Sequence, residues 1–182
     1  MANARGVADG GVVDGGVSLI FVYGTLKRGF YNHSLISDLM NTGDAAFIGP
    51  RATLDAFPLV CGPNGIPYLI NLPGSGHRIR GELYSVSSGR GLARLDELEG
   101  VDRAHYERLP VAVVEDGGDE VVHAEAYFAH REFAEAMKNR CGEEGLISEY
   151  SSEMGRKYVR REDRPSHSCF LHDINKFISE ES

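Results

Sequence analysis

Cysteine is scarce in this sequence, and the few that occur show no pairing pattern. The 182 residues include only Cys61, Cys141 and Cys169. Because their number is odd, their spacing is wide and no Cys-x-x-Cys is present, the pattern argues against a disulfide framework. A reducing compartment is the expected environment, and we predict a cytoplasmic location.

Long apolar runs and an excess of positive charge are also missing. No stretch of about 18 apolar residues is present that could span a membrane. Residues 1–17 have no apolar core behind basic residues, which argues against a signal peptide and predicts a disordered lead-in. The formal net charge is −8 and the isoelectric point is near 5.3. This negative net charge argues against nucleic acid and anionic membranes as partners. It does not exclude a small anionic substrate, because a local site can have the opposite charge.

Several common catalytic motifs are absent as well. There is no Gly-x-Ser-x-Gly elbow for serine hydrolysis, and no Gly-Lys-Ser/Thr follows a glycine turn. The one spacing that approaches a metal site, His167, Cys169 and His172, has three potential ligands and no obvious fourth. We therefore predict no metal and no cofactor, and we expect a monomer.

Short apolar segments separated by glycine and proline indicate that strands predominate. β-branched and aromatic residues predict strands at 19–23, 66–70, 79–86, 106–115 and 121–129. Gly81 inside one of them indicates a bulge or a close backbone approach. Helical spacing predicts helices at 32–40, 92–99 and 131–140, the second ending at Gly100. Because the helices are inserted between strands without regular alternation, the pattern favours an α+β fold.

The turn after the first predicted strand is a candidate anion site. Its residues are Tyr23, Gly24, Thr25 and Leu26. Glycine permits a tight turn whose successive backbone N–H groups can form a concave anion site. Lys27 and Arg28 follow directly and could add positive charge. An ordinary strand-to-helix loop would explain the same residues, and spacing alone leaves both interpretations open.

Glu99 is the candidate proton carrier. On a helical wheel of about 100° per residue, Glu99 falls about 20° from Leu92 on the apolar stripe, whereas Glu97 falls about 140° away. Burial and a helix C-terminus both disfavour an ionised carboxyl, which suits a group that exchanges protons near neutral pH. The alternative is a partly exposed glutamate paired with Arg103 or Arg108.

Glu82 is a rival carboxylate on a predicted strand. By alternation it lies on the same face as Arg80 and Tyr84. An ion pair explains it without any catalytic role, and we favour that explanation.

Together these segments resemble the γ-glutamylcyclotransferase-like superfamily. The most specific segment is 21–29, followed by Asn32 and His33. Within the superfamily the sequence is most similar to the γ-glutamylamine cyclotransferases and the plant avirulence-induced-gene-like proteins. Further similar segments are 57–60, 66–69, 72–76, 81–84, 95–99, 106–108, Tyr150 and 158–164. The resemblance spans about residues 19–164.

The resemblance implies a small mixed β-barrel with peripheral helices, formed by residues 18–164. It implies that the Tyr23–Leu26 turn binds the γ-glutamyl group, and that Glu99 is the single catalytic acid/base residue. Residues 165–182 form a polar tail outside the resemblance. Phe170, Ile174 and Phe177 have partial helical spacing there, but we expect the tail to bury little apolar surface.

The implied reaction is that of a γ-glutamylamine cyclotransferase. The α-amine of the substrate attacks its own γ-carbonyl, which yields 5-oxoproline and a free amine such as lysine. Two alternatives remain: a cyclotransferase for γ-glutamyl amino acids or glutathione, and a non-catalytic small-molecule-binding or interaction protein on the same fold.

Overall fold

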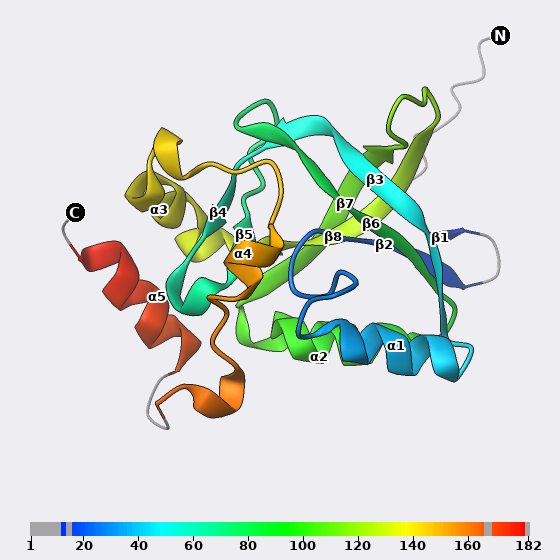
Figure 1. Ribbon diagram of the computed structural model, residues 1–182, viewed down its shortest axis with the longest axis horizontal. Helices are drawn as coiled ribbons and strands as arrows, with labels where there is room; N and C mark the ends of the chain where they lie inside the picture. The colour runs from blue at the N-terminus through cyan, green and yellow to red at the C-terminus, as the bar shows by residue number, and fades with distance from the viewer. Residues whose placement is uncertain (1–11, 14–15, 166–168, 181–182) are drawn as a thin grey trace, which may run out of the picture.

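A closed barrel of five strands forms the centre of the protein (Figure 1). The computed structural model describes residues 12–13, 16–165 and 169–180. The barrel strands are β2 (Val17–Val22), β3 (Ala45–Phe57), β6 (His77–Val86), β7 (Tyr106–Val114) and β8 (Val121–Ala129). They follow the order β2-β6-β3-β7-β8, and β8 pairs with β2 to close the ring. The β2–β8 pairing is parallel and the others are antiparallel, which confirms the predicted mixed barrel.

Shorter elements surround the barrel. β1 (Val12–Val13) pairs with β2, while β4 (Leu59–Cys61) and β5 (Pro67–Leu69) form a separate ribbon. The helices are α1 (His33–Asn41), α2 (Gly89–Glu99), α3 (Arg131–Cys141), α4 (Ser152–Gly155) and α5 (Phe170–Ser179). Single 3-10 turns are η1 (Pro63–Gly65), η2 (Val101–Arg103), η3 (Glu143–Gly145) and η4 (Arg161–Asp163). In Figure 1, α1 and α2 run along one side of the barrel, and α3 and α5 lie together beside β4.

The lead-in predicted to be disordered covers residues 1–17. Val12 and Val13 form β1, which pairs with the start of β2. Residues 1–11 and 14–15 lie outside the described part of the chain.

Strand alternation divides the buried side chains into two clusters. Phe21 belongs to the inner cluster, whereas its neighbours Ile20 and Val22 belong to the cluster beneath the helices. This period of two is what a sheet closed into a barrel imposes, because successive side chains point to opposite faces. The inner cluster comprises Phe21, Tyr23, Phe57, Leu59, Leu69, Ile79, Leu83, Val111, Val113, Ala124, Ala126 and Phe128.

Gly81 permits the packing of Phe21 inside the barrel. A Cβ at Gly81 would meet the Phe21 ring at 2.6 Å and would also clash with the carbonyl oxygen of Val22. The close backbone approach predicted from this glycine is therefore confirmed.

Helix α2 is fixed at both ends by local signals. The Ser88 side chain accepts a hydrogen bond from the Gly91 N–H at 2.9 Å, which caps the first turn. Gly100 has φ +64° and ends the helix in the left-handed conformation, as its position predicts. The cap places Glu99 as the last residue of the helix.

The expectation that the tail buries little apolar surface is wrong. Ile174 of α5 is fully buried, and Phe170, Phe177 and Ile178 pack against the same cluster. The α5 apolar stripe contacts α3, so the tail adds to the core that the barrel and helices share. Residues 166–168 and 181–182 lie outside the described part of the chain.

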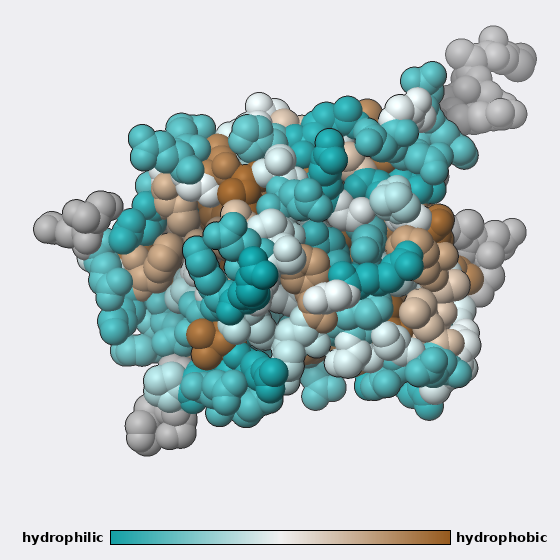
Figure 2. Space-filling view, viewed as in Figure 1, coloured by the Kyte–Doolittle hydropathy of each residue, from teal (hydrophilic) through white to brown (hydrophobic). Residues whose placement is uncertain are grey.

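The surface is mainly hydrophilic on the face shown in Figure 2, with hydrophobic residues in small groups. The large exposed apolar side chains come from separate segments: Tyr31, Ile48, Leu54, Leu72, Val121 and Leu171. Among the described residues, no helix has the length and apolar character needed to cross a membrane.

Candidate active site

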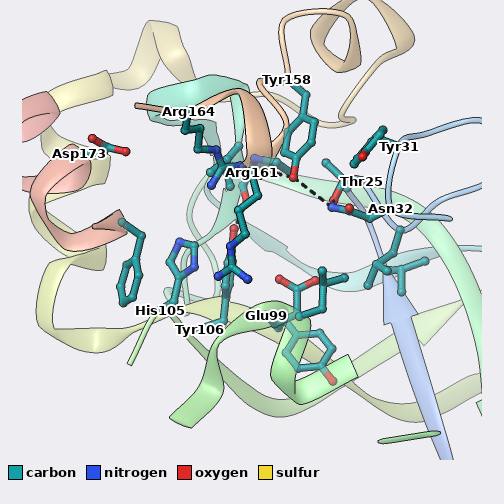
Figure 3. A pocket seen from close by; sticks show the side chains of 18 of the residues that line it. Thr25, Tyr31, Asn32, Glu99, His105, Tyr106, Tyr158, Arg161, Arg164 and Asp173 are labelled. Carbon is teal, nitrogen blue, oxygen red and sulfur yellow. Dashed lines mark hydrogen bonds between the residues drawn. The ribbon is translucent and has the colours of Figure 1, made fainter. Parts of the chain in front are cut away.

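A cavity of about 630 Å³ lies where the turn after β2, the end of α2 and the segment after α4 meet (Figure 3). All five residues predicted from the sequence line it: Tyr23, Gly24, Thr25, Leu26 and Glu99. Its volume falls in the usual range for small-molecule sites. The structure therefore brings the two separate sequence candidates, the turn and the glutamate, into one cavity.

The turn is held rigidly by neighbouring side chains. Asn32 donates through Nδ2 to the Thr25 hydroxyl at 2.8 Å, and its backbone N–H donates to the Thr25 carbonyl at 3.0 Å. His33 Nδ1 lies 2.9 Å from the carbonyl oxygen of Leu26. Within the described residues, the backbone N–H groups of Gly24, Thr25 and Leu26 donate to no protein acceptor. Three successive donors are therefore available to a bound group.

Gly24 lies against Pro67, and no side chain fits between them. A Cβ at Gly24 would meet Pro67 Cγ at 2.6 Å. The carbonyl of Pro67 in turn accepts the Tyr106 hydroxyl at 2.7 Å, which fixes the proline. Glycine is therefore required here for close approach, as the turn interpretation predicts.

Glu99 is half-buried, and burial raises the pKa of its carboxyl to about 8. The negative charge of Asp96, one helical turn earlier, is the second and smaller cause of this shift. Within the described part of the chain, the Glu99 carboxyl has no hydrogen bond or ion pair. A carboxyl of this kind holds a proton near neutral pH and can exchange it with a ligand.

The arginines considered as partners of Glu99 bind elsewhere. Arg108 lies 2.9 Å from Asp96 and 2.7 Å from Glu125, and Arg103 donates to the carbonyl oxygen of Glu97 at 3.2 Å. The Glu97 side chain is exposed, as its wheel position predicts. The interpretation of Glu99 as an ion-paired surface residue is therefore wrong.

Glu82 does not form the expected ion pair with Arg80 and does not line the cavity. Its carboxylate accepts the Tyr84 hydroxyl at 2.8 Å and the backbone N–H of Arg28 at 3.1 Å. Glu82 thus anchors the residues that follow the turn from outside the cavity.

The idea that Lys27 and Arg28 add charge to the turn is also wrong. Lys27 is buried and donates to the Tyr150 carbonyl at 2.8 Å, away from the cavity lining. The Arg28 guanidinium lies over the Phe47 ring, 3.3 Å from its centroid. Neither residue lines the cavity.

Tyrosines form much of the cavity wall. Tyr23 donates to the Tyr127 carbonyl at 2.6 Å, and Tyr127 donates to Asp96 at 2.8 Å. Burial raises the pKa of Tyr23, Tyr106 and Tyr127, so their hydroxyl groups remain protonated donors. The wall therefore combines apolar ring faces with fixed polar groups.

Sequence reasoning missed the positive charge of the cavity. Arg103, Arg161 and Arg164 line it, together with Tyr158 and Glu162. All but Arg103 belong to the segment 158–164, which was noted only as similar to the family and was given no role. Among the described residues, no group of three or more His, Cys, Asp or Glu side chains is arranged to hold a metal.

The sequence model described as "Gamma-glutamyl cyclotransferase, AIG2-like" matches residues 20–148, and the chain belongs to this family. The matched part contains the Tyr23–Leu26 turn and Glu99, but it ends before the segment 158–164.

Named relatives and a solved structure agree with this family. The Arabidopsis thaliana protein "Putative gamma-glutamylcyclotransferase At3g02910" is 48% identical over 176 residues, covering 89% of this chain and 92% of its own. Human "Gamma-glutamylaminecyclotransferase" is 46% identical over 103 residues, covering 55% of this chain and 65% of its own. The crystal structure of an AIG2-like protein from Mus musculus superposes with a TM-score of 0.65 at 34% identity, covering 81% of this chain and 99% of that one. Family and relatives together support γ-glutamyl cyclotransferase activity.

Proposed function

We propose that the protein is a γ-glutamylamine cyclotransferase that releases 5-oxoproline and a free amine. The observation that carries this proposal is the shared cavity of the Tyr23–Leu26 turn and Glu99. The turn offers three uncommitted N–H donors, and Glu99 offers a carboxyl that holds a proton near neutral pH.

The substrate contains both reacting groups. Its α-amine is the nucleophile and its γ-carbonyl is the electrophile, and folding brings them together in a five-membered ring. A well-oriented intramolecular reaction of this kind reaches effective molarities of about 10⁵–10⁸ M. The cavity's first task is therefore to hold the glutamyl group in its folded conformation.

Glu99 handles the proton transfers. An α-ammonium group bound beside Glu99 favours the ionised carboxylate, which then removes a proton to free the nucleophile. As the new C–N bond forms and the amide C–N bond breaks, the protonated Glu99 gives that proton to the leaving amine. The ionised Glu99 then removes the second proton from the ring nitrogen and passes it to the released amine, which departs as its ammonium ion. One carboxyl performs both steps, and such acid/base catalysis typically contributes about 10²–10⁴-fold. The reaction balances with no further reactant.

The turn binds the negative charge of the substrate. Backbone N–H groups of Gly24, Thr25 and Leu26 can donate hydrogen bonds to the α-carboxylate or to the oxyanion that develops at the γ-carbon. Gly24 lets the turn pack directly against Pro67, because no Cβ intervenes.

The direct test is a 5-oxoproline release assay with γ-glutamyl-ε-lysine, γ-glutamyl-alanine and glutathione. We expect turnover of γ-glutamyl-ε-lysine. Turnover of glutathione alone would replace this proposal with the glutathione alternative. Absence of turnover with every substrate, from correctly folded protein, would favour a binding protein on this fold.

A further inference from the structure

The cavity has a positively charged end that the proposed reaction leaves unused. We call it the arginine end, defined by Arg103, Arg161 and Arg164, all of which line the cavity. In Figure 3, Arg164 and Asp173 lie toward one side of the pocket and Thr25 toward the other, with Arg161 and Glu99 between them. The arginine end therefore adjoins the reacting groups without being part of the turn.

All three arginines act electrostatically on the His105 ring. Burial first, and then the charges of Arg164, Arg103 and Arg161, together lower the pKa of His105 to about 3. The His105 ring is therefore neutral near pH 7. Its Nε2 atom lies 2.8 Å from the Tyr68 hydroxyl oxygen. The positive charge at this end comes from the arginines alone.

The hydrogen-bond acceptors of Arg164 and Arg103 are uncharged. Arg164 donates to the Val159 carbonyl at 3.0 Å and to the Tyr158 hydroxyl at 3.4 Å, while Arg103 donates to a backbone carbonyl. Among the described residues, none of the three forms an ion pair with a carboxylate. Their charge is available to a ligand.

The acidic groups in the cavity lining offset this charge only in part. Glu162 accepts the Tyr31 hydroxyl at 2.9 Å, and Asp173 accepts Asn64 Nδ2 at 3.1 Å. Glu99 is protonated near neutral pH. The cavity thus carries three positive and two negative charges in a chain whose formal net charge is −8, which indicates an anionic ligand group.

We propose that Arg161 and Arg164 bind a carboxylate on the leaving half of the substrate, so the preferred γ-glutamyl amides are those whose amine is an amino acid. This inference rests on the proposed function. With the glutamyl half at the turn and its amide at Glu99, the leaving amine extends toward the arginine end. A planar guanidinium group matches a carboxylate through two parallel hydrogen bonds. Both arginines belong to segment 158–164, beyond the family match at residues 20–148.

The test uses substrate pairs that differ only by that carboxylate. γ-Glutamyl-ε-lysine is compared with γ-glutamyl-cadaverine, and γ-glutamyl-alanine with γ-glutamyl-ethylamine. Each is assayed with the wild type, Arg161→Gln and Arg164→Gln. Arg156→Gln is the control, because Arg156 is exposed and does not line the cavity. Thermal unfolding of each variant checks that the fold is intact.

We expect the wild type to favour the carboxylate-bearing member of at least one pair. Arg161→Gln and Arg164→Gln should lower kcat/KM for that substrate by about ten- to a hundredfold, the effect of losing a charge-assisted hydrogen bond. Turnover of its carboxylate-free partner should stay near the wild-type value. Equal losses of kcat/KM on both members of a pair would overturn the inference, because the arginines would then bind the glutamyl half or stabilise the fold. Equal kcat/KM values of the wild type for the two members of each pair would also overturn the inference.

Failure of the proposed function gives a different result. No 5-oxoproline from any substrate would reject the cyclotransferase proposal. The arginine end is then tested by calorimetry: the wild type must bind γ-glutamyl-ε-lysine more tightly than γ-glutamyl-cadaverine, and Arg161→Gln must abolish the difference. Equal binding of the two by the wild type would reject the carboxylate site.

Discussion

Replacing Glu99 with glutamine should stabilise the protein increasingly as pH rises. Burial raises the pKa of Glu99 from 4.5 to about 8. Below pH 4.5 the carboxyl is protonated in both the folded and unfolded states, so its contribution to stability is fully present. Between pH 4.5 and 8 the unfolded chain releases this proton and the folded protein keeps it, so stability falls as pH rises. Glutamine has no titratable proton, so the stability of Glu99→Gln does not fall over this pH range for that reason.

The magnitude follows from the pKa shift. Each pKa unit corresponds to about 1.36 kcal/mol. Because Glu99 is only half-buried and lines an open cavity, we discount the full shift for solvent screening and expect on the order of 2–3 kcal/mol. For a chain of this size that amounts to roughly 5–10 °C in Tm.

The assay is thermal unfolding of wild type and Glu99→Gln from pH 5 to pH 9. The Tm difference should be small at pH 5, should grow through pH 8 and should then level off. Glu97→Gln is the matched control, since Glu97 is exposed on the same helix and its Tm difference should not follow this curve. A Tm difference for Glu99→Gln that is constant with pH, or that reverses sign, would refute the burial of a protonated carboxyl.

Three further substitutions test other parts of the structure. Gly24→Ala should lower kcat/KM by about ten- to a hundredfold because the new Cβ displaces Pro67 or the turn; Gly89→Ala, which meets no atom within 4 Å, should leave it unchanged in the same assay. Ile174→Ala should cost about 2–5 kcal/mol of unfolding free energy in urea titrations, and equal stability of Ile174→Ala and the exposed Leu171→Ala would show that α5 does not pack on the core. Glu82→Gln should keep a rate close to wild type, because Glu82 does not line the cavity; complete inactivity with intact folding would contradict its placement.

Local patterns in the sequence predicted the elements whose signals are local. The wheel position of Glu99 was informative because the helical period fixes which residues share a face. The cap at Gly100 and the close approach at Gly81 follow from glycine chemistry in the same way. Each of these predictions needed only neighbouring residues.

Strand β3 (Ala45–Phe57) was not predicted, because its sequence does not show the regular hydrophobic pattern of a strand. Gly49 and Pro50 interrupt it, and its pairing with β6 shifts register twice, between Phe47 and Gly49 and between Ala52 and Ala56. Its buried positions 45, 49, 53 and 57 do lie on one face, but they are occupied by Ala, Gly, Thr and Phe, so hydrophobicity marks only the last of them clearly. A period-two search cannot detect such a strand.

The arginine end could not be predicted because its members are far apart in the chain. Arg103 follows α2, whereas Arg161 and Arg164 belong to the segment after α4. Only the packing of the C-terminal segment against the rest of the fold brings them to one cavity. Residues that are far apart in the chain and meet only in the folded protein leave no periodic pattern in the sequence.

The central claim is that Glu99 carries the proton in 5-oxoproline formation, and the most direct measurement is the turnover rate of Glu99→Gln. Glutamine preserves the size and a hydrogen-bonding group but cannot exchange a proton at neutral pH. With γ-glutamyl-ε-lysine, kcat should fall by at least about 10²-fold, while calorimetry shows that the substrate still binds and Glu97→Gln keeps the wild-type rate. A fully active Glu99→Gln would contradict the account.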